Sequence, residues 1–408
     1  MKLQISTITA SFATAAILAW PTAASALKDL VIDVNCASGD RIARALDRPN
    51  VLDRRMVIVV NGNCNENVTI ERDDVTLKAG TSGGGVTAAD SSKPAVQING
   101  ARRVAVEGLG LTGGLHGVQA IGGAVVAIRA AAIRNAVQNG VFVFGSSTAT
   151  IDRSTIENHG NSGVAVVAAS SATMTGSTVR GNALYGVAAS RGGSVLLGNF
   201  DAAGTVCCGN LIENNVFDGV LAAEASAVHL YGNTIQGNGT TTGRFGLLAV
   251  RQSSIVLRGG NVVRQNGSAT GGGGAFARAS TINTGPGDTP INPPTNDFSG
   301  NTFGVQGASN SLVELRAGVS VTGNRFTGVV ADTGTTVRSD GSTITGNGAH
   351  GIFAQRDSSV ELFGAITTVT GNTAYGLYCN DPETSYSGNV SQITGNTLGD
   401  VAPSCTGY

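Results

Sequence analysis

The chain has 408 residues and a formal net charge of −1, and its composition excludes several classes of protein. Glycine accounts for 59 residues, roughly twice the usual ~7%, while charged residues make up 13%, about half the usual ~25%. The near-zero net charge gives no indication of nucleic-acid binding. Hydrophobic residues make up 41% of the chain, which is too large a share for a disordered protein. The composition instead favours many short strands joined by tight turns.

Residues 1–26 have the pattern of a secretory signal peptide. Lys2 gives the positive start, residues 5–20 are mostly apolar, and residues 24–26 (Ala-Ser-Ala) fit the small-x-small cleavage pattern. The apolar stretch is short and no stop-transfer charges follow it, which argues against the alternative of a transmembrane anchor. No later segment is long and apolar enough to span a bilayer, so we expect a secreted or periplasmic protein.

Residues 27–56 are predicted to form an N-terminal cap. A short amphipathic helix is expected over Asp40–Arg48, with Asp40 as its N-cap residue. Its apolar face would consist of Ile42, Ala45 and Leu46. Such a helix would cover the open end of a stacked β-structure, which otherwise exposes core and strand edges.

A short repeat follows this cap and continues through most of the chain. Each copy starts with a glycine and alternating aliphatic residues, as in GVFVF from Gly140 and GVAVV from Gly163. The glycines lie 23, 23, 23, 33, 27, 28, 30, 24, 23 and 25 residues apart. They are Gly117, Gly140, Gly163, Gly186, Gly219, Gly246, Gly274, Gly304, Gly328, Gly351 and Gly376. A period of this length is the signature of a repeat architecture.

Each copy contains three short strand candidates. These are the glycine step, a Ser-x-Val-x-Leu-x-Gly segment such as residues 226–232, and an Ile or Val step that ends in Asn. Strands this short cannot bury a face alone, but stacked coils ~4.8 Å apart would form three parallel sheets around one core. The sequence therefore predicts an all-β parallel β-helix of about a dozen coils over residues 57–380, with a C-terminal cap over residues 381–408.

Asparagines mark the turn before many of the repeat glycines. They are Asn135, Asn158, Asn182, Asn214, Asn301, Asn324, Asn347 and Asn372. Asn tolerates left-handed backbone better than most residues, and stacked identical amides can bond along a ladder. We expect the glycine that follows to allow the sharp turn into the next strand.

The glycine-aliphatic step and the Asn turns resemble the pectin-lyase-like superfamily of single-stranded right-handed parallel β-helices, in particular its general parallel β-helix repeat group. The resemblance covers roughly residues 57–378 and implies right-handed coils. It says less about function, because this fold hosts many activities. An immunoglobulin-like sandwich would need longer strands without a shared register, and a β-propeller would need blades of ~40–50 residues.

All six cysteines follow the predicted signal peptide, and an exported chain can form disulfides. Cys36 and Cys64 flank the cap helix and the strand after it, so a bridge between them would hold the cap. Cys379 and Cys405 flank the end of the last coil. Pairing within each end is the simplest of the possible arrangements. Residues 207–208 (Cys-Cys) could form a vicinal disulfide or, less readily, ligate a metal ion.

Four successive coils between Gly186 and Gly304 carry insertions. Two follow the second strand, at Asn199–Gly209 and Thr284–Asp297. Two follow the Asn turn, at Gly239–Arg244 and Gly267–Gly273. Loops on a rigid scaffold often carry function, although surface insertions also cost little stability.

The outward positions of the first strand form a row of mostly small or apolar residues. The row is Gln119, Phe142, Ala165, Ala188, Leu221, Leu248, Phe276, Gln306, Val330, Phe353 and Tyr378. Because it contains no acid, base or nucleophile, we expect a docking stripe or a face covered by loops, and not a polar active site.

Charged residues gather on the second strand and in the turn before it. By analogy with pectin-lyase-like enzymes, this strand would form the substrate-facing sheet. The candidate ligand-binding residues are Tyr231, Arg251, Arg258, Arg278, Glu314 and Arg338. Glu314, Arg338 and Glu361 alternate in sign on adjacent coils, as do Arg316 and Asp340, so a solvated ladder of ion pairs is the alternative.

His229 is the candidate for an acid–base residue, because it projects from the second strand beside Tyr231. The other histidines, His116, His159 and His350, lie in or next to Asn-type turns and are expected to be exposed. A glycosidase would hold two carboxylates roughly 5–10 Å apart, and a lyase would hold a basic residue beside acids that bind calcium. We find neither pattern, and no metal site is predicted.

Three functions therefore stay open. The protein could bind an extended polysaccharide or a cell-surface glycan along the rod. It could be a polysaccharide lyase, hydrolase or epimerase, with calcium as the cofactor of a lyase. It could also be a structural or adhesive solenoid whose contact face is the apolar row.

Overall fold

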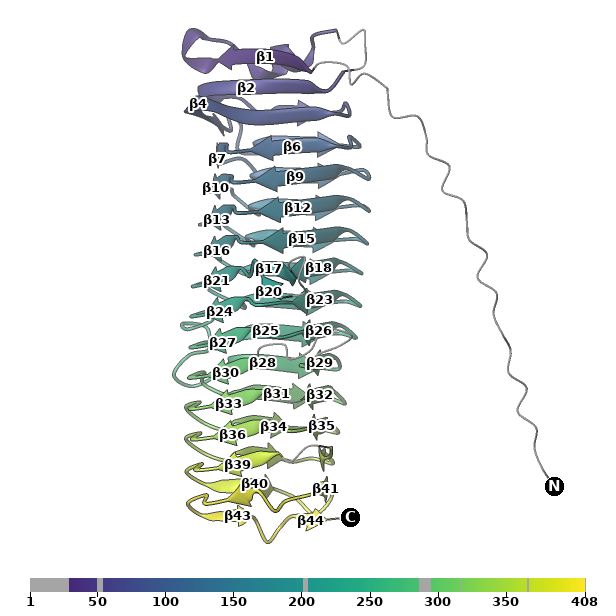
Figure 1. Cartoon of the computed structure of the whole chain (residues 1–408), viewed down its shortest axis with the longest axis vertical. Helices are drawn as coiled ribbons and strands as arrows, with labels where there is room; N and C mark the ends of the chain where they lie inside the picture. Colours follow the sequence, from purple (N-terminus) through teal and green to yellow (C-terminus); the bar gives the residue numbers. More distant parts are fainter. Residues whose placement is uncertain are drawn as a thin grey trace, which may run out of the picture.

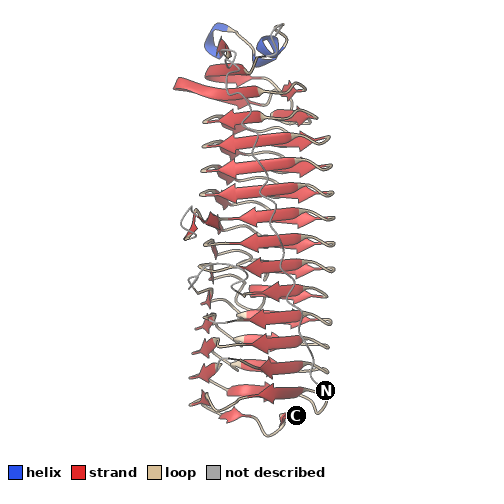
Figure 2. Ribbon diagram, turned by 45° about the vertical axis from the view of Figure 1, so that its right-hand side comes forward, coloured by secondary structure: helices blue, strands red, loops and turns tan. Residues whose placement is uncertain are grey.

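The structure is a computed structural model, and it describes residues 29–49, 54–200, 205–285, 295–316, 318–364 and 367–407. The chain winds into one stack of about 15 turns, somewhat more than the dozen expected (Figure 1). Strands dominate the described residues (Figure 2), and helix is confined to α1 (Ile42–Leu46) and a 3-10 helix at Cys36–Ser38. Neither helix is long enough to cross a bilayer. The predicted signal peptide, residues 1–26, lies outside the described residues.

Three ladders of parallel strands run along the stack. The first sheet consists of β3 (Val68–Ile70), β5 (Val96–Asn99), β8 (Val118–Ile121), β11 (Val141–Phe144), β14 (Val164–Val167), β17 (Val187–Ser190), β22 (Val220–Ala223), β25 (Phe245–Val250), β28 (Gly273–Arg278), β31 (Val305–Ala308), β34 (Val329–Ala331), β37 (Ile352–Ala354), β40 (Tyr375–Cys379) and β43 (Gly399–Val401).

The second sheet consists of β1 (Leu30–Asn35), β2 (Met56–Asn65), β4 (Val75–Thr87), β6 (Val104–Glu107), β9 (Val125–Arg129), β12 (Thr148–Asp152), β15 (Ser171–Thr175), β18 (Ser194–Leu197), β23 (Ala227–Leu230), β26 (Ser254–Leu257), β29 (Thr281–Asn283), β32 (Leu312–Leu315), β35 (Thr336–Ser339), β38 (Ser359–Leu362), β41 (Ser385–Gly388) and β44 (Thr406–Gly407).

The third sheet consists of β7 (Gly110–Thr112), β10 (Ala132–Arg134), β13 (Thr155–Glu157), β16 (Thr178–Arg180), β21 (Leu211–Glu213), β24 (Thr234–Gln236), β27 (Val262–Arg264), β30 (Asp297–Ser299), β33 (Ser320–Thr322), β36 (Thr343–Thr345), β39 (Thr368–Thr370) and β42 (Ile393–Thr394). The long strand β4 joins it to the second sheet, since β4 pairs with both β6 and β7.

The register of the first sheet confirms the repeat. Phe142 of β11 lies opposite Gln119 of β8 and Ala165 of β14. Its neighbours Val141 and Val143 are fully buried, while Phe142 itself is half-buried. Alternate residues of every coil therefore enter one continuous core, and the remaining ones form rows on the outside.

The repeat glycine is required by close packing and not by a left-handed turn. Gly163 does not adopt a positive φ, so its backbone conformation is one that other residues also adopt. A Cβ atom there would lie 2.3 Å from Cγ1 of Val179 and 2.9 Å from Nδ2 of Asn182. Those contacts correct the expectation that the glycine makes the turn.

Asparagines have two separate roles after the third strand. At the first position of the turn, Asn135, Asn158 and Asn214 adopt φ of 59°, 61° and 54°, and glycine occupies this position on other coils. At the next position, buried asparagines form a continuous amide ladder. The ladder runs through Asn182, Asn215, Asn238, Asn266, Asn301, Asn324, Asn347, Asn372 and Asn396.

Each rung of this ladder satisfies backbone groups of its neighbours. The Nδ2 of Asn238 donates to Oδ1 of Asn266 (3.1 Å) and to the carbonyl of Ile212 (3.1 Å). Its Oδ1 accepts from the backbone and side-chain nitrogens of Asn215, at 3.1 and 2.8 Å. A second ladder, Asn210, Asn233, Asn261 and Asn296, fills the bend between the second and third strands in the same way.

His159 takes the place of an asparagine at the N-terminal end of the first ladder. Its Nδ1 accepts from the backbone N–H of Ala136 (3.0 Å), and its Nε2 lies 3.2 Å from the carbonyl of Ile133. An imidazole with the proton on Nε2 makes both bonds, so the residue must be neutral. Burial lowers the pKa of His159 to about 4.

Two histidines expected to be exposed are thus buried, His159 with 2% and His116 with 3% exposure. His116 stacks on Phe142, with ring centroids 4.6 Å apart, and burial lowers its pKa to about 4. The expectation was wrong because a turn in a solenoid is covered by the turns of the neighbouring coils. His350 is half-buried against Tyr375 and Tyr378.

The N-terminal helix is shorter than expected and has a different cap. Its N-cap position is Arg41, without a side-chain hydrogen bond, and Asp40 instead accepts from the backbone N–H of Asn35. The backbone N–H groups of Ile42 and Ala43, which have no partner within the helix, donate to the carboxylate of Glu66 at 2.7 and 3.2 Å. Glu66 is only 2% exposed, and it lies 24 residues beyond the helix start, so no local pattern indicates it.

Three disulfides are present, Cys36–Cys64, Cys207–Cys208 and Cys379–Cys405. The first and third are the bridges expected at the two ends of the stack. The vicinal bridge lies at the end of a small antiparallel hairpin, β19 (Asn199–Phe200) and β20 (Val206–Cys207), which forms the first insertion.

Replacing Asn238 by Ala should lower the free energy of unfolding by about 2 kcal/mol or more, because it leaves buried amide and carbonyl groups on both neighbouring coils without partners. Asn65→Ala, at an exposed position, should change it by less than about 0.5 kcal/mol. Chemical denaturation of both variants measures the difference. Equal stabilities would contradict a stabilising ladder.

His159→Asn should make the protein less sensitive to acid. The folded-state pKa of His159 lies below the ordinary value of 6.5, so the unfolded chain binds the proton first and stability is lost as pH falls from 6.5 towards 4. The loss attributable to this residue amounts to about 3 kcal/mol at the most acidic end. Melting temperatures measured across this pH range should fall less steeply for the variant, which keeps the ladder bonds. An unchanged slope would refute the assignment.

Candidate functional site

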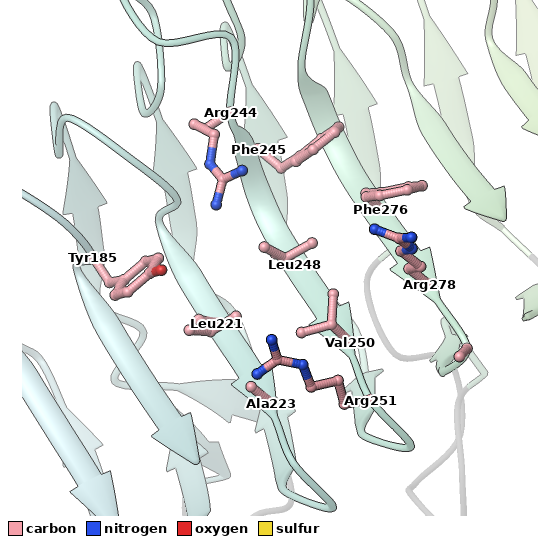
Figure 3. Close-up of a pocket in the computed structure, with 11 residues that line it drawn as sticks. Tyr185, Leu221, Ala223, Arg244, Phe245, Leu248, Val250, Arg251, Phe276 and Arg278 are labelled. Carbon is pink, nitrogen blue, oxygen red and sulfur yellow. The ribbon is translucent and has the colours of Figure 1, made fainter. Parts of the chain in front are cut away.

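A pocket of ≈660 Å³ opens on the outer face of the first sheet, over β17, β22, β25 and β28 (Figure 3). Its floor is made by residues of the outward row, among them Leu221 and Leu248, which are 9% and 6% exposed. Together with Ala188 and Ala223 they form an apolar cluster outside the main core. Three residues of the outward row, Leu221, Leu248 and Phe276, therefore line this pocket.

Aromatic rings border this floor. Tyr185, Asp218 and Phe245 each directly precede a repeat glycine and occupy equivalent places on three successive coils. The two rings line the pocket, whereas Asp218 between them is short and fully buried, which leaves space over its coil. Phe276 stacks on Phe245 with centroids 4.9 Å apart.

Three arginines give the pocket its charge: Arg244, Arg251 and Arg278. Arg251 pairs with Glu224 at 2.9 Å, and Arg244 pairs with Asp218 at 3.3 Å. Arg278 is exposed, and no carboxylate among the described residues lies within ion-pair distance of it. The pocket therefore combines an apolar floor with an excess of positive charge, which favours an anionic ligand with apolar faces.

The candidates from the second strand separate into two groups. Arg251 and Arg278 lie at the turn where the first strand ends, and their side chains line the pocket on the first sheet. His229, Glu314 and Arg338 lie in strands of the second sheet, and Tyr231 and Arg258 directly follow its strands β23 and β26. None of these residues lines the pocket.

Most of the charges on the second sheet are paired. Arg338 forms ion pairs with Glu361 at 2.7 Å and with Glu314 at 3.9 Å. Glu314 also pairs with Arg316 at 3.1 Å and accepts from Asn283. These pairs form the cross-strand ion-pair ladder that the sequence indicated as the alternative to a binding site.

His229 is half-buried on β23, opposite Val256 of β26. Burial, and to a smaller extent the charge of Arg258, lower its pKa below the usual 6.5. A neutral imidazole could accept a proton there, but none of the pockets described is lined by it. Its catalytic role stays a prediction.

No group of three His, Cys, Asp or Glu side chains within the described ranges stands in a position to hold a metal ion. The site residues that the sequence reasoning did not single out are Tyr185, Arg244 and Phe245. Two signals point to them: aromatic residues directly before a repeat glycine, and the arginine that ends the insertion Gly239–Arg244.

Residues 94–266 match the family model for a right-handed β-helix region. No curated protein matches the sequence. Among solved structures, the A-module of mannuronan C-5 epimerase AlgE4 from Azotobacter vinelandii is similar with 13% identity and a TM-score of 0.47, covering 85% of this chain and 91% of that one. Pectate lyase Pel9A has 12% identity and a TM-score of 0.38, with coverage of 70% and 77%. The periplasmic alginate epimerase AlgG has 12% identity and a TM-score of 0.36, with coverage of 92% and 81%.

The three parallel ladders define the fold of this protein as a parallel β-helix. The match to the right-handed β-helix family model agrees with this fold over residues 94–266, which is less than half of the chain. Because the similarity to the solved structures is low, it assigns no activity to this chain.

Proposed function

We propose that the protein binds an extended acidic polysaccharide on the outer face of the first sheet, with the pocket as the main contact site. The observation that carries this proposal is the combination of three arginines with a ring-bordered apolar floor. A guanidinium presents a planar fork of donors that matches a carboxylate or sulfate. The leucine floor and the aromatic rings offer apolar surface to the apolar faces of a sugar ring.

The shape of the sheet supports a long ligand. The first sheet continues in both directions from the pocket, from β3 to β43. Solenoids commonly use such extended surfaces for binding. The enzymes named in the structural comparison act on polysaccharides of this kind, namely mannuronan, pectate and alginate.

The proposed location is outside the cytoplasm, either secreted or periplasmic. The predicted signal peptide at residues 1–26 supports it, and so do the three disulfides, since such bonds persist in oxidising compartments.

Binding can be tested by affinity electrophoresis or calorimetry with polygalacturonate, alginate and a neutral glucan. The acidic polymers should bind and the neutral one should not. Arg278→Gln and Phe245→Ala should each weaken binding about tenfold, the equivalent of ~1.4 kcal/mol. Arg264→Gln is the matched control, because this exposed arginine lies on the third sheet and bonds to an amide, Gln236.

Equal binding of the neutral polymer, or full affinity in Arg278→Gln, would refute the proposal. Unsaturated products or new reducing ends during the same incubations would instead favour a lyase or a hydrolase, and a changed uronate configuration would favour an epimerase.

A further inference from the structure

Arg244 is held in a cradle built from two insertions. It ends the insertion Gly239–Arg244, where its N–H donates to the carbonyl of Gly239 (3.3 Å), and its own carbonyl accepts from Gly273 of the next insertion (3.1 Å). A Cβ atom at Gly272 would lie 2.0 Å from the Arg244 carbonyl oxygen, and one at Gly239 would lie 2.7 Å from the Arg244 Cβ. Both insertions thus need glycine where they wrap around this arginine.

The side chain of Arg244 extends over the pocket (Figure 3). It is held there by contacts with Phe217 and Asp218. Its Cζ lies 5.2 Å from the ring centroid of Phe217, and one Nη lies 3.3 Å from Oδ2 of Asp218. The Arg244 side chain is 36% exposed, whereas the Asp218 side chain is not exposed at all. Arg244 therefore has one side against a buried carboxylate and the other side open to a ligand.

Asp218 is an unusual partner, because it is buried and incompletely bonded. Its Oδ1 accepts from the backbone N–H of Phe245 at 2.7 Å. Its Oδ2 and the Nε of Arg244 have no hydrogen-bond partner among the described residues, despite the short distance between the two side chains. Burial raises the pKa of Asp218 to about 6, and the positive charge of Arg244 opposes this shift only in part.

We propose that Arg244 binds the anionic group of a ligand in this pocket and that Asp218 is its positioning residue, so that anion binding is coupled to the uptake of one proton from solvent by Asp218. When a ligand anion binds, it and the Asp218 carboxylate would both interact with the Arg244 guanidinium, which is only partly exposed to water. Protonating the Asp218 carboxylate removes that competition and leaves the whole charge of Arg244 to the ligand.

Arg244 is the charged side chain that acts on Asp218. Tyr185, Arg251 and Arg278 are the other titratable or charged side chains lining the pocket. Arg251 is already paired with Glu224, at 2.9 Å. The inference rests on the proposed function for the chemical nature of the natural ligand, but the anion site can be tested with inorganic sulfate alone.

The experiment is a titration of the full chain with sodium sulfate at constant ionic strength, followed by thermal unfolding at about pH 5 and about pH 8, on either side of the Asp218 transition. Sulfate also stabilises proteins by exclusion from their surface, and Arg244→Gln measures that general part. After this general effect is subtracted, the wild type should bind sulfate about tenfold more tightly at about pH 5 than at about pH 8. A tenfold difference is expected if bound sulfate raises the pKa of Asp218 by about one unit.

Asp218→Asn keeps an acceptor for the Phe245 N–H and lacks the charge, so its sulfate affinity should be the same at both pH values and equal to that of the wild type in acid. Arg325→Gln is the matched control and should behave like the wild type, since Arg325 also lies over a phenylalanine, Phe326, at 5.5 Å. A full sulfate response in Arg244→Gln would overturn the inference, and so would a wild-type pH dependence in Asp218→Asn.

Calorimetry of the wild type in buffers of different ionisation enthalpy gives an independent result if Asp218→Asn does not fold. Proton uptake on sulfate binding near pH 6 is expected, and its absence overturns the coupling. Sulfate binding without any binding of acidic polysaccharide would refute the proposed function and leave this inference standing. The reverse result would refute the inference alone.

Discussion

Every coil of this protein depends on the bonds that its turns make to the next coil. The buried positions of a turn, such as those of Asn182 and Asn238, are covered by neighbouring coils, so their polar groups need partners within the stack. The asparagine ladders meet this requirement, because one amide both donates to and accepts from neighbouring coils at the same time. His159 is tolerated in the ladder only because a neutral imidazole offers one donor and one acceptor at suitable places.

The same constraint decides where the chain can vary. Insertions enter beside the ladder positions and not within them: Asn238 and Asn266 keep their bonds although each is followed by a longer loop. Variation is therefore concentrated on the outside of the stack, over the first sheet and beside the bend after the second. The pocket forms where two such loops adjoin Leu221 and Leu248 of the outward row, and where Asp218 lies buried between the coils of Tyr185 and Phe245.

Charge is used differently on the two faces. On the second sheet, acids and bases lie in register on adjacent coils, and Glu314, Arg338 and Glu361 neutralise one another. At the pocket on the first sheet, Arg244 comes from a loop, Arg251 from a turn and Arg278 from the last position of β28. Arg278 has no carboxylate partner among the described residues. At the pocket, three arginines face two paired carboxylates, Asp218 and Glu224, which is why an anionic ligand is expected there.

The sequence by itself determined the fold, because a period near 23 residues with alternating aliphatic positions leaves few other ways to bury so many short strands. It also indicated the outward rows and the alternating charges of the second sheet, because these follow from register, and it favoured the bridges at the two ends as the simplest pairing. It did not indicate the pocket on the first sheet, and the role proposed for His229 on the second sheet stays a prediction. The tertiary structure placed Arg251 and Arg278 on the other side of their turn, brought Arg244 over Asp218 from an insertion, and buried His116 and His159. These outcomes depend on the direction in which each turn projects and on which loop covers it, and neither is encoded in a local pattern.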